Sequence, residues 1–146
     1  MSRNVESPGN LAARSAQASR EVRRDSDLRR ARTCYDHLAG VAGVDLLEEM
    51  LSRGWFRVEE GTKPSYHLTS DGERALLGLG VDLPTAAAQR RPFAYGCLDW
   101  TERRYHLRGS LSAAILTALS NSGTVVRTAG TRTVALKRPM VDWLQS

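Results

Sequence analysis

The chain has 146 residues, of which 41% are hydrophobic and 25% are charged, a composition typical of a folded globular protein. This length allows one domain, or two very small ones that share a core. No apolar run reaches the roughly 18 residues that a membrane-spanning helix needs, and no secretory signal follows Met1. Two cysteines without an export signal predict reduced intracellular thiols, so we expect a cytoplasmic protein.

The net charge of +5 is unevenly distributed along the chain. Residues 1–32 carry +4, residues 33–88 carry −5 and residues 89–146 carry +6. Basic ends around an acidic middle indicate contact with nucleic acid, or electrostatic docking of one half on the other. A solvated surface without a partner is also consistent with this pattern.

Hydrophobic spacing predicts a mainly α protein that begins with a flexible basic arm. Helices are expected where apolar residues recur at three- and four-residue spacing. Hairpins are expected where the period changes to two around a glycine or proline turn. In chain order, we expect a first helix over 27–40, then a helix over 44–54, a hairpin over 55–69, a helix over 70–80, helical segments over 94–100 and 106–123, a hairpin over 124–137 and a closing helix over 139–144.

The two halves of the chain carry the same motifs. His37-Leu38-x-Gly40 recurs 69 residues later as His106-Leu107-x-Gly109, and Cys34-x-Asp36 recurs 63 residues later as Cys97-x-Asp99. The second copy therefore has six extra residues between its Asp and its His. We interpret the pattern as duplication of a helix-helix-hairpin-helix unit.

The order of elements in each copy is similar to a winged helix. The predicted fold class is α+β, mainly α, with tandem winged-helix-like repeats that share one core. The predicted division of the chain is a flexible basic arm over 1–24, a first repeat over 25–82, a connector over 83–92 and a second repeat over 93–146.

A resemblance to a known family rests on three segments of the chain. RRARTCYDHLAGVAGVDLLEEMLSRGWF, YHLTSDGERAL and RRPFAYGCLDWTERRYHLRGSLSAAIL resemble the C-terminal region of a group of ArsR-type winged-helix transcriptional regulators, over roughly residues 28–146. The resemblance implies a cytoplasmic bacterial regulator that binds operator DNA as a dimer and responds to an inducer. Members of that group normally place an N-terminal winged helix, with its recognition helix, before this region, where this chain has the arm.

Each copy of the motif contains a thiol, a carboxylate and an imidazole. Cys34 and His37 share one face of the predicted first helix, and packing of the halves with two-fold symmetry would bring Cys97 and His106 beside them. Thiolate and imidazole ligands suit zinc or another thiophilic metal. Core packing and an organic ligand site are the alternatives, because cysteine is commonly buried as a small hydrophobe. The motif carboxylates are expected to pair with arginines or to cap a neighbouring helix.

Basic residues in the last part of the chain are candidates for contacts with DNA phosphates. Within DWTERRYH, Trp100 and Tyr105 alternate with arginines, a pattern that suits a phosphate backbone or an anionic ligand, although Trp100 also suits a core anchor. Cations on the second hairpin suit a wing that grips phosphates. The predicted DNA-binding residues are Arg103, Arg104, Arg108, Arg127, Arg132, Lys137 and Arg138.

These observations predict a DNA-associated transcriptional regulator that contacts double-stranded DNA through the arm and the second repeat, as a homodimer. The alternative is a stand-alone sensory or dimerisation module, without its own operator-reading helix, that pairs with a full-length regulator. An enzyme is not expected, since the sequence has no GxSxG, phosphate-binding glycine loop or zincin motif.

Overall fold

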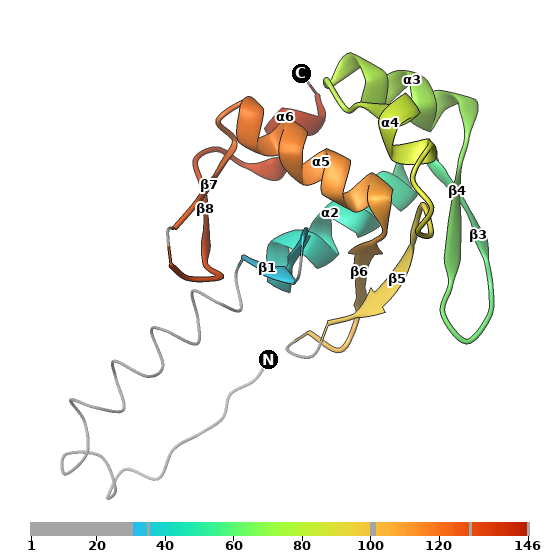
Figure 1. Cartoon of the computed structure of the whole chain (residues 1–146), viewed down its shortest axis with the longest axis horizontal. Coiled ribbons are helices and arrows are strands. Elements are labelled where there is room, and N and C mark those ends of the chain that lie inside the picture. The colour runs from blue at the N-terminus through green and yellow to red at the C-terminus, as the bar shows by residue number, and fades with distance from the viewer. Residues whose placement is uncertain (1–30, 35, 100–101, 129, 146) are drawn as a thin grey trace, which may run out of the picture.

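The computed structural model describes residues 31–34, 36–99, 102–128 and 130–145, and the predicted basic arm over 1–24 lies outside them. Figure 1 shows two central helices between hairpins. The elements in chain order are β1 (Arg32–Cys34), β2 (His37–Ala39), α2 (Gly40–Ser52), β3 (Phe56–Glu59), β4 (Ser65–Leu68), α3 (Ser70–Gly78), α4 (Leu83–Ala87), β5 (Tyr95–Leu98), β6 (Tyr105–Arg108), α5 (Ser110–Asn121), β7 (Val125–Arg127), β8 (Val134–Leu136) and α6 (Met140–Leu144).

The strands pair as antiparallel hairpins that interlock between the halves of the chain. The β3–β4 and β5–β6 hairpins join into one four-stranded sheet through the pair Ser65 and Tyr95. The β1–β2 and β7–β8 hairpins meet at a bridge between Arg32 and Thr133, where the Thr33 N–H donates to the Arg132 carbonyl at 2.9 Å. The first hairpin of each half is therefore bonded to the second hairpin of the other half.

The recurring glycine of the His-Leu-x-Gly motif lies where each long helix begins. Gly40 has φ of 78° at the start of α2, and Gly109 has φ of 113° before α5. These backbone angles favour glycine, because an L side chain is strained there. At Gly109 a Cβ would also lie 2.4 Å from the Phe93 carbonyl oxygen. The motif thus encodes the transition from strand to helix in both halves.

The interior is one apolar cluster to which both halves contribute. The two long helices lie at its centre, with Leu47 and Met50 of α2 and Leu116 and Leu119 of α5 fully buried. Trp143 of α6 closes the cluster at the end of the chain and is 1% exposed. No helix among the described residues is long and apolar enough to cross a membrane.

The predicted mainly α architecture of tandem winged-helix-like repeats is wrong. The structure is α+β with three antiparallel sheets in its described part. The described part of the helix expected over 27–40 forms β1 and β2, and the segment expected to be helical over 94–100 contributes β5. No helical pair therefore precedes either wing in these residues. Each long helix instead lies between two hairpins, because cross-strand pairing and burial of these short segments override their helix-like spacing.

The order of elements nevertheless recurs along the chain. Each half runs hairpin, long helix, hairpin and short helix, with α4 as an addition in the first half. Two residues separate Cys34 from His37, whereas eight separate Cys97 from His106. The six extra residues of the second copy thus lie between Cys97 of β5 and His106 of β6. The predicted division into repeats over 25–82 and 93–146 stays a prediction.

Candidate metal centre

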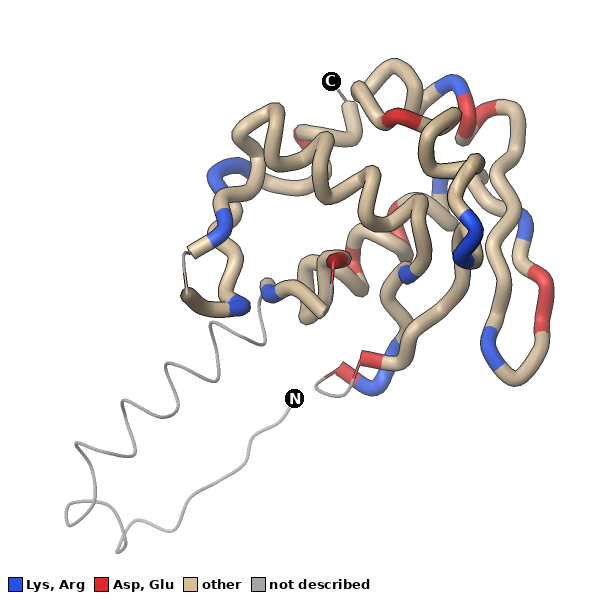
Figure 2. The backbone as a smooth tube through the Cα atoms, in the orientation of Figure 1, with Lys and Arg blue, Asp and Glu red and all other residues tan. Residues whose placement is uncertain are grey.

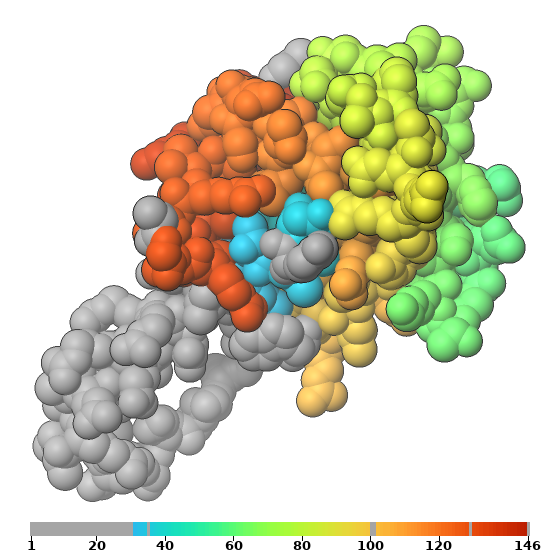
Figure 3. Space-filling model, viewed as in Figure 1, coloured from blue at the N-terminus to red at the C-terminus, as the bar shows by residue number. Residues whose placement is uncertain are grey.

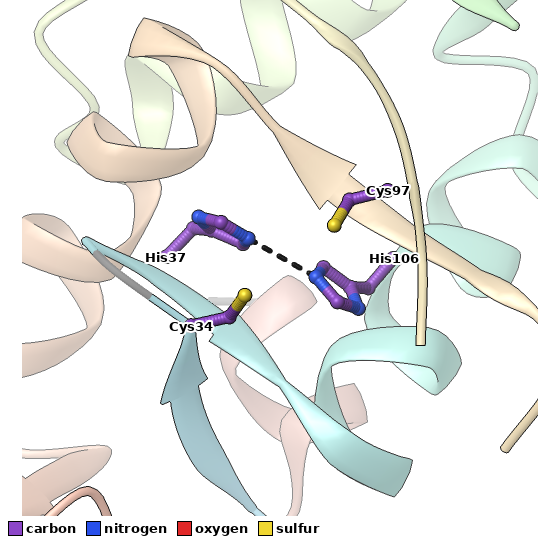
Figure 4. Close-up of side chains that lie close together, drawn as sticks. All are labelled: Cys34, His37, Cys97 and His106. Carbon is purple, nitrogen blue, oxygen red and sulfur yellow. Dashed lines mark hydrogen bonds between the residues drawn. The ribbon is translucent and has the colours of Figure 1, made fainter. Parts of the chain in front are cut away.

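Two hairpins bring together the four cysteine and histidine residues that the sequence singled out. Cys34 of β1 is the register partner of His37 of β2, and Cys97 of β5 is the register partner of His106 of β6. One ligand atom from each of the four residues lies within 4.8 Å of the others. Figure 4 shows the thiols and imidazoles facing a common centre. Their spacing had suggested that Cys34 and His37 lie on one face of a helix. In the structure they face each other across the β1–β2 hairpin.

The two imidazoles are in direct contact at the centre. His37 and His106 are 0% and 1% exposed, and their Nε2 atoms lie 3.0 Å apart. Two nitrogens bound to one tetrahedral zinc ion at about 2.0–2.1 Å would lie about 3.3 Å apart. A shift of a few tenths of an ångström therefore separates the observed contact from the spacing that a shared ion requires.

Asp99 is a buried carboxylate that orients His106. It accepts from His106 Nδ1 at 3.1 Å, from Arg32 Nη2 at 3.0 Å and from the Gly40 N–H at 2.6 Å. The contact with Gly40 places a negative charge at the N-terminus of α2, where the helix dipole favours it. Asp99 thus both pairs with an arginine and caps a helix, the two roles that the sequence suggested for it.

Asp36 holds a similar position beside His37. Its Oδ1 lies 3.6 Å from His37 Nδ1, and its Oδ2 lies 2.7 Å from Arg91 Nη2. The first distance is too long for a hydrogen bond, and His37 Nδ1 is a buried nitrogen without a hydrogen-bond partner. Each imidazole therefore has a carboxylate at Nδ1, and each carboxylate has an arginine. No pattern in the sequence indicates which arginines these are.

Burial favours the neutral forms of His37, His106 and Cys97. Burial lowers the pKa of His37 to about 4, with further lowering from His106 and Arg108 and partial compensation by Asp36. Burial also lowers the pKa of His106, against the opposing effect of Asp99. The pKa of Cys97 is raised by burial and by the neighbouring Cys34, while Arg108 acts in the opposite direction. Neutral imidazoles are the form that binds a metal ion.

The seven predicted phosphate-binding residues divide between two hairpins. Arg103, Arg104 and Arg108 belong to the β5–β6 hairpin, where Arg104 Nη1 is bonded to both carboxylate oxygens of Glu48 at 2.8 and 3.0 Å. Arg108 lies above the ring of Tyr95 and beside Cys97, at the edge of the Cys/His centre. Trp100 lies outside the described residues.

The other four predicted residues, Arg127, Arg132, Lys137 and Arg138, are exposed on or beside the β7–β8 hairpin. Figure 2 shows Lys and Arg positions along this hairpin. Arg138 also donates to Thr124 Oγ1 at 3.0 Å. No Asp or Glu occurs between Glu102 and Asp142 in the sequence.

A cavity of about 630 Å³ lies between β4 and the segment that enters β5. Tyr66, Phe93 and Tyr95 contribute aromatic surface, and Lys63 contributes a cation to its wall. This cavity is separate from the Cys/His centre, for which the sequence left an organic ligand as an alternative, and none of the four Cys/His residues lines it.

The chain is similar to a transcriptional regulator of helix-turn-helix type. This relative is the uncharacterised HTH-type transcriptional regulator YdfF of Bacillus subtilis (strain 168), with 34% identity over 117 residues. The match covers 80% of this chain but 50% of the relative, so the chain spans about half the length of the curated protein that it matches. No family model and no solved structure matches the chain.

Proposed function

We propose that this chain is the sensory part of a cytoplasmic transcriptional regulator of the ArsR group, and that its ligand is zinc or a similar thiophilic divalent metal ion. The ligands would be Cys34, His37, Cys97 and His106. The proposal depends on one observation, the convergence of these four side chains from two hairpins within 4.8 Å. Two thiolates and two imidazoles form a set that zinc accepts in tetrahedral geometry. The chain would bind and report, without a catalytic step.

Three features favour a metal site over core packing. Burial of two histidines costs free energy, because their polar ring atoms leave water. Their Nε2 atoms lie 3.0 Å apart and face each other, so these atoms do not hydrogen-bond a backbone group of the core. Each imidazole also has a carboxylate at its other nitrogen, which is the usual environment of a metal-binding histidine. The cysteines are only half-buried, so an ion can reach the site from the surface.

The position of the site suits a sensor. The ligands come in equal number from each half, so a bound ion would tie the β1–β2 hairpin to the β5–β6 hairpin. A ligand that binds one arrangement of the halves more tightly than another shifts the population between them. We propose that operator reading belongs to another part of the regulator or to a full-length partner, since the described residues contain no helical pair before a wing. We also propose that two copies of the regulator pair as a homodimer.

Titration of the purified chain with Co²⁺ and Zn²⁺ tests the metal site. We expect one ion per chain, with the visible bands of tetrahedral Co²⁺ and a thiolate-to-metal absorption that Zn²⁺ abolishes. His37→Ala and His106→Ala should lose the tetrahedral bands. His67→Ala is the matched control, because His67 lies on β4 and is bonded to Glu59. A wild-type chain that takes up neither ion at micromolar concentration would contradict the proposal.

A second candidate function is contact with DNA phosphates through the β7–β8 hairpin. Its four exposed cations lie in a stretch without acidic residues. Lysine and arginine in such a stretch attract the phosphate backbone without reading its sequence. This contact would support a recognition helix elsewhere in the regulator.

A further inference from the structure

Two series of neighbouring histidine, aspartate and arginine side chains flank the Cys/His centre. The two series differ in the contact between the histidine and the aspartate. In the first, His106 Nδ1 lies 3.1 Å from Asp99 Oδ2, and Asp99 Oδ1 lies 3.0 Å from Arg32 Nη2. In the second, Asp36 Oδ2 lies 2.7 Å from Arg91 Nη2, but Asp36 Oδ1 is 3.6 Å from His37 Nδ1. The histidine and aspartate are hydrogen-bonded in the first series but not in the second.

The hydrogen bond between the imidazoles explains why His37 Nδ1 is not bonded to Asp36. Asp99 is an acceptor, so the proton of neutral His106 lies on Nδ1 and its Nε2 is an acceptor. The 3.0 Å contact between the Nε2 atoms then requires that His37 carries its proton on Nε2. His37 Nδ1 is consequently a bare lone pair that faces the Asp36 carboxylate. Two acceptors repel, which accounts for their separation of 3.6 Å.

A metal ion at the centre would reverse this arrangement, because it needs the lone pair on both Nε2 atoms. His106 already offers its lone pair, whereas His37 must move its proton to Nδ1. There the N–H group points at Asp36, which Arg91 already holds in place. Metal-binding histidines nearly always donate their other N–H to a carboxylate or carbonyl.

We propose that His37 is a tautomeric switch, with its proton on Nε2 in the metal-free chain and on Nδ1, donated to Asp36, in the metal-bound chain. This inference rests on the proposed function, since it names how the proposed metal site reports its occupancy. The proton count balances, because the two thiols release two protons to solvent as they bind the ion. His37 loses one proton from Nε2, gains one on Nδ1 and stays neutral.

A hydrogen bond from His37 Nδ1 to Asp36 would connect the ion, through Arg91, to the segment that joins the two halves. Arg91 lies in the stretch between α4 and β5, and its Nη2 also reaches the Gly109 carbonyl, 3.5 Å away, directly before α5. In the space-filling view, the surface of β1–β2 lies between β7–β8 and the yellow stretch that leads into β5 (Figure 3). A bond between His37 and Asp36 would therefore link the first hairpin, the connecting stretch and the start of α5.

Nitrogen NMR of the histidine rings tests the switch directly. In the ¹⁵N-labelled full chain with a chelator present, long-range correlations should show His37 as the Nε2–H tautomer and His106 as the Nδ1–H tautomer. With one equivalent of Zn²⁺ both should show Nδ1–H and a metal-bound Nε2, so only His37 changes tautomer. His67, outside the site, is the internal reference.

Substitutions test the role of Asp36 independently. Asp36→Ala should weaken Zn²⁺ binding by about tenfold or more, as removal of such carboxylates does in other zinc sites, and Arg91→Gln should weaken it by a smaller factor. Glu59→Gln is the matched control, since it removes the carboxylate of the exposed pair with His67 and should leave the affinity unchanged.

The outcomes separate the two proposals. A chain that binds no zinc contradicts the proposed function and the switch together. Zinc bound while His37 keeps its proton on Nε2, or ligated through Nδ1, overturns the switch and leaves the metal site standing. Unchanged zinc affinity in Asp36→Ala also overturns it.

Discussion

His37 and His106 meet through their Nε2 atoms at 3.0 Å, although their positions in the chain differ by 69. The contact joins two hairpins that each pair a cysteine with a histidine. Since each half supplies one hairpin, neither half contains the complete site. A ligand bound there would contact both halves.

The first prediction concerns the two cysteines. Cys34→Ser and Cys97→Ser should each abolish binding of Zn²⁺, because a three-ligand site with a neutral hydroxyl is a much poorer zinc site. Thermal unfolding of the metal-free variants should differ little from the wild type, since both thiols are only half-buried. Binding is measured by competition with a chromophoric chelator. A large loss of stability with no zinc binding in the wild type would identify the thiols as core residues instead.

The second prediction concerns pH. Burial lowers the pKa of His37 to about 4 from the ordinary 6.5. Between these values the unfolded chain binds a proton that the folded chain does not, so the free energy of unfolding should rise with pH across this window and level off above 6.5. The full effect is on the order of 3 kcal/mol. His106, whose pKa is lowered too, should add to it.

Urea denaturation of the metal-free chain at several pH values measures this effect. The His67→Ala variant is the control, because His67 is exposed on β4 and lies outside the Cys/His centre. A stability that is flat from pH 4 to 6.5 would show that the buried imidazoles titrate as they do in the unfolded chain.

The third prediction concerns the buried ion pair of Arg32 and Asp99. Both side chains are 0% exposed, so removal of the cation leaves a buried carboxylate without its main charge partner. Arg32→Met should destabilise the fold by about 3–5 kcal/mol. In contrast, Arg74→Met, which breaks an exposed pair with Asp71 on α3, should cost about 0–1 kcal/mol. Equal effects of the two substitutions in urea denaturation would contradict the structural role of the Arg32–Asp99 pair.

Part of the fold was predictable from sequence, because some elements have a clear periodicity. The helices expected over 44–54 and 106–123 overlap α2 and α5, and the hairpins expected over 55–69 and 124–137 correspond to β3–β4 and β7–β8. The β1–β2 hairpin was missed since its strands are three residues long, and all three residues of β2 are buried. Such strands show no alternation, and the spacing of Ala31 and Leu38 imitated a helix.

The candidate site was predictable only in its ligands. Repetition of the Cys-Asp and His-Leu-x-Gly motifs indicated that the four ligands would converge, because equivalent positions of packed repeats meet near their common axis. The supporting arginines could not be chosen from sequence. Arg32 and Arg91 are two of 21 basic residues, and only the interlocked hairpins place them beside Asp99 and Asp36.

The final prediction tests contact with DNA. If the cations of the β7–β8 hairpin bind phosphates, retardation of a DNA duplex should weaken by on the order of tenfold or more as salt rises from about 50 to 200 mM. Arg127→Ala with Arg132→Ala should reduce the slope of log affinity against log salt by about two, since each phosphate contact contributes about 0.9. Arg57→Ala with Arg74→Ala removes the same charge from the acidic middle of the chain and should leave the slope unchanged. Absence of retardation at low salt would show that this hairpin does not bind DNA and would assign DNA contact to another part of the regulator. Equal slopes for the two double variants would show that the change in salt dependence follows from net charge alone and not from this hairpin.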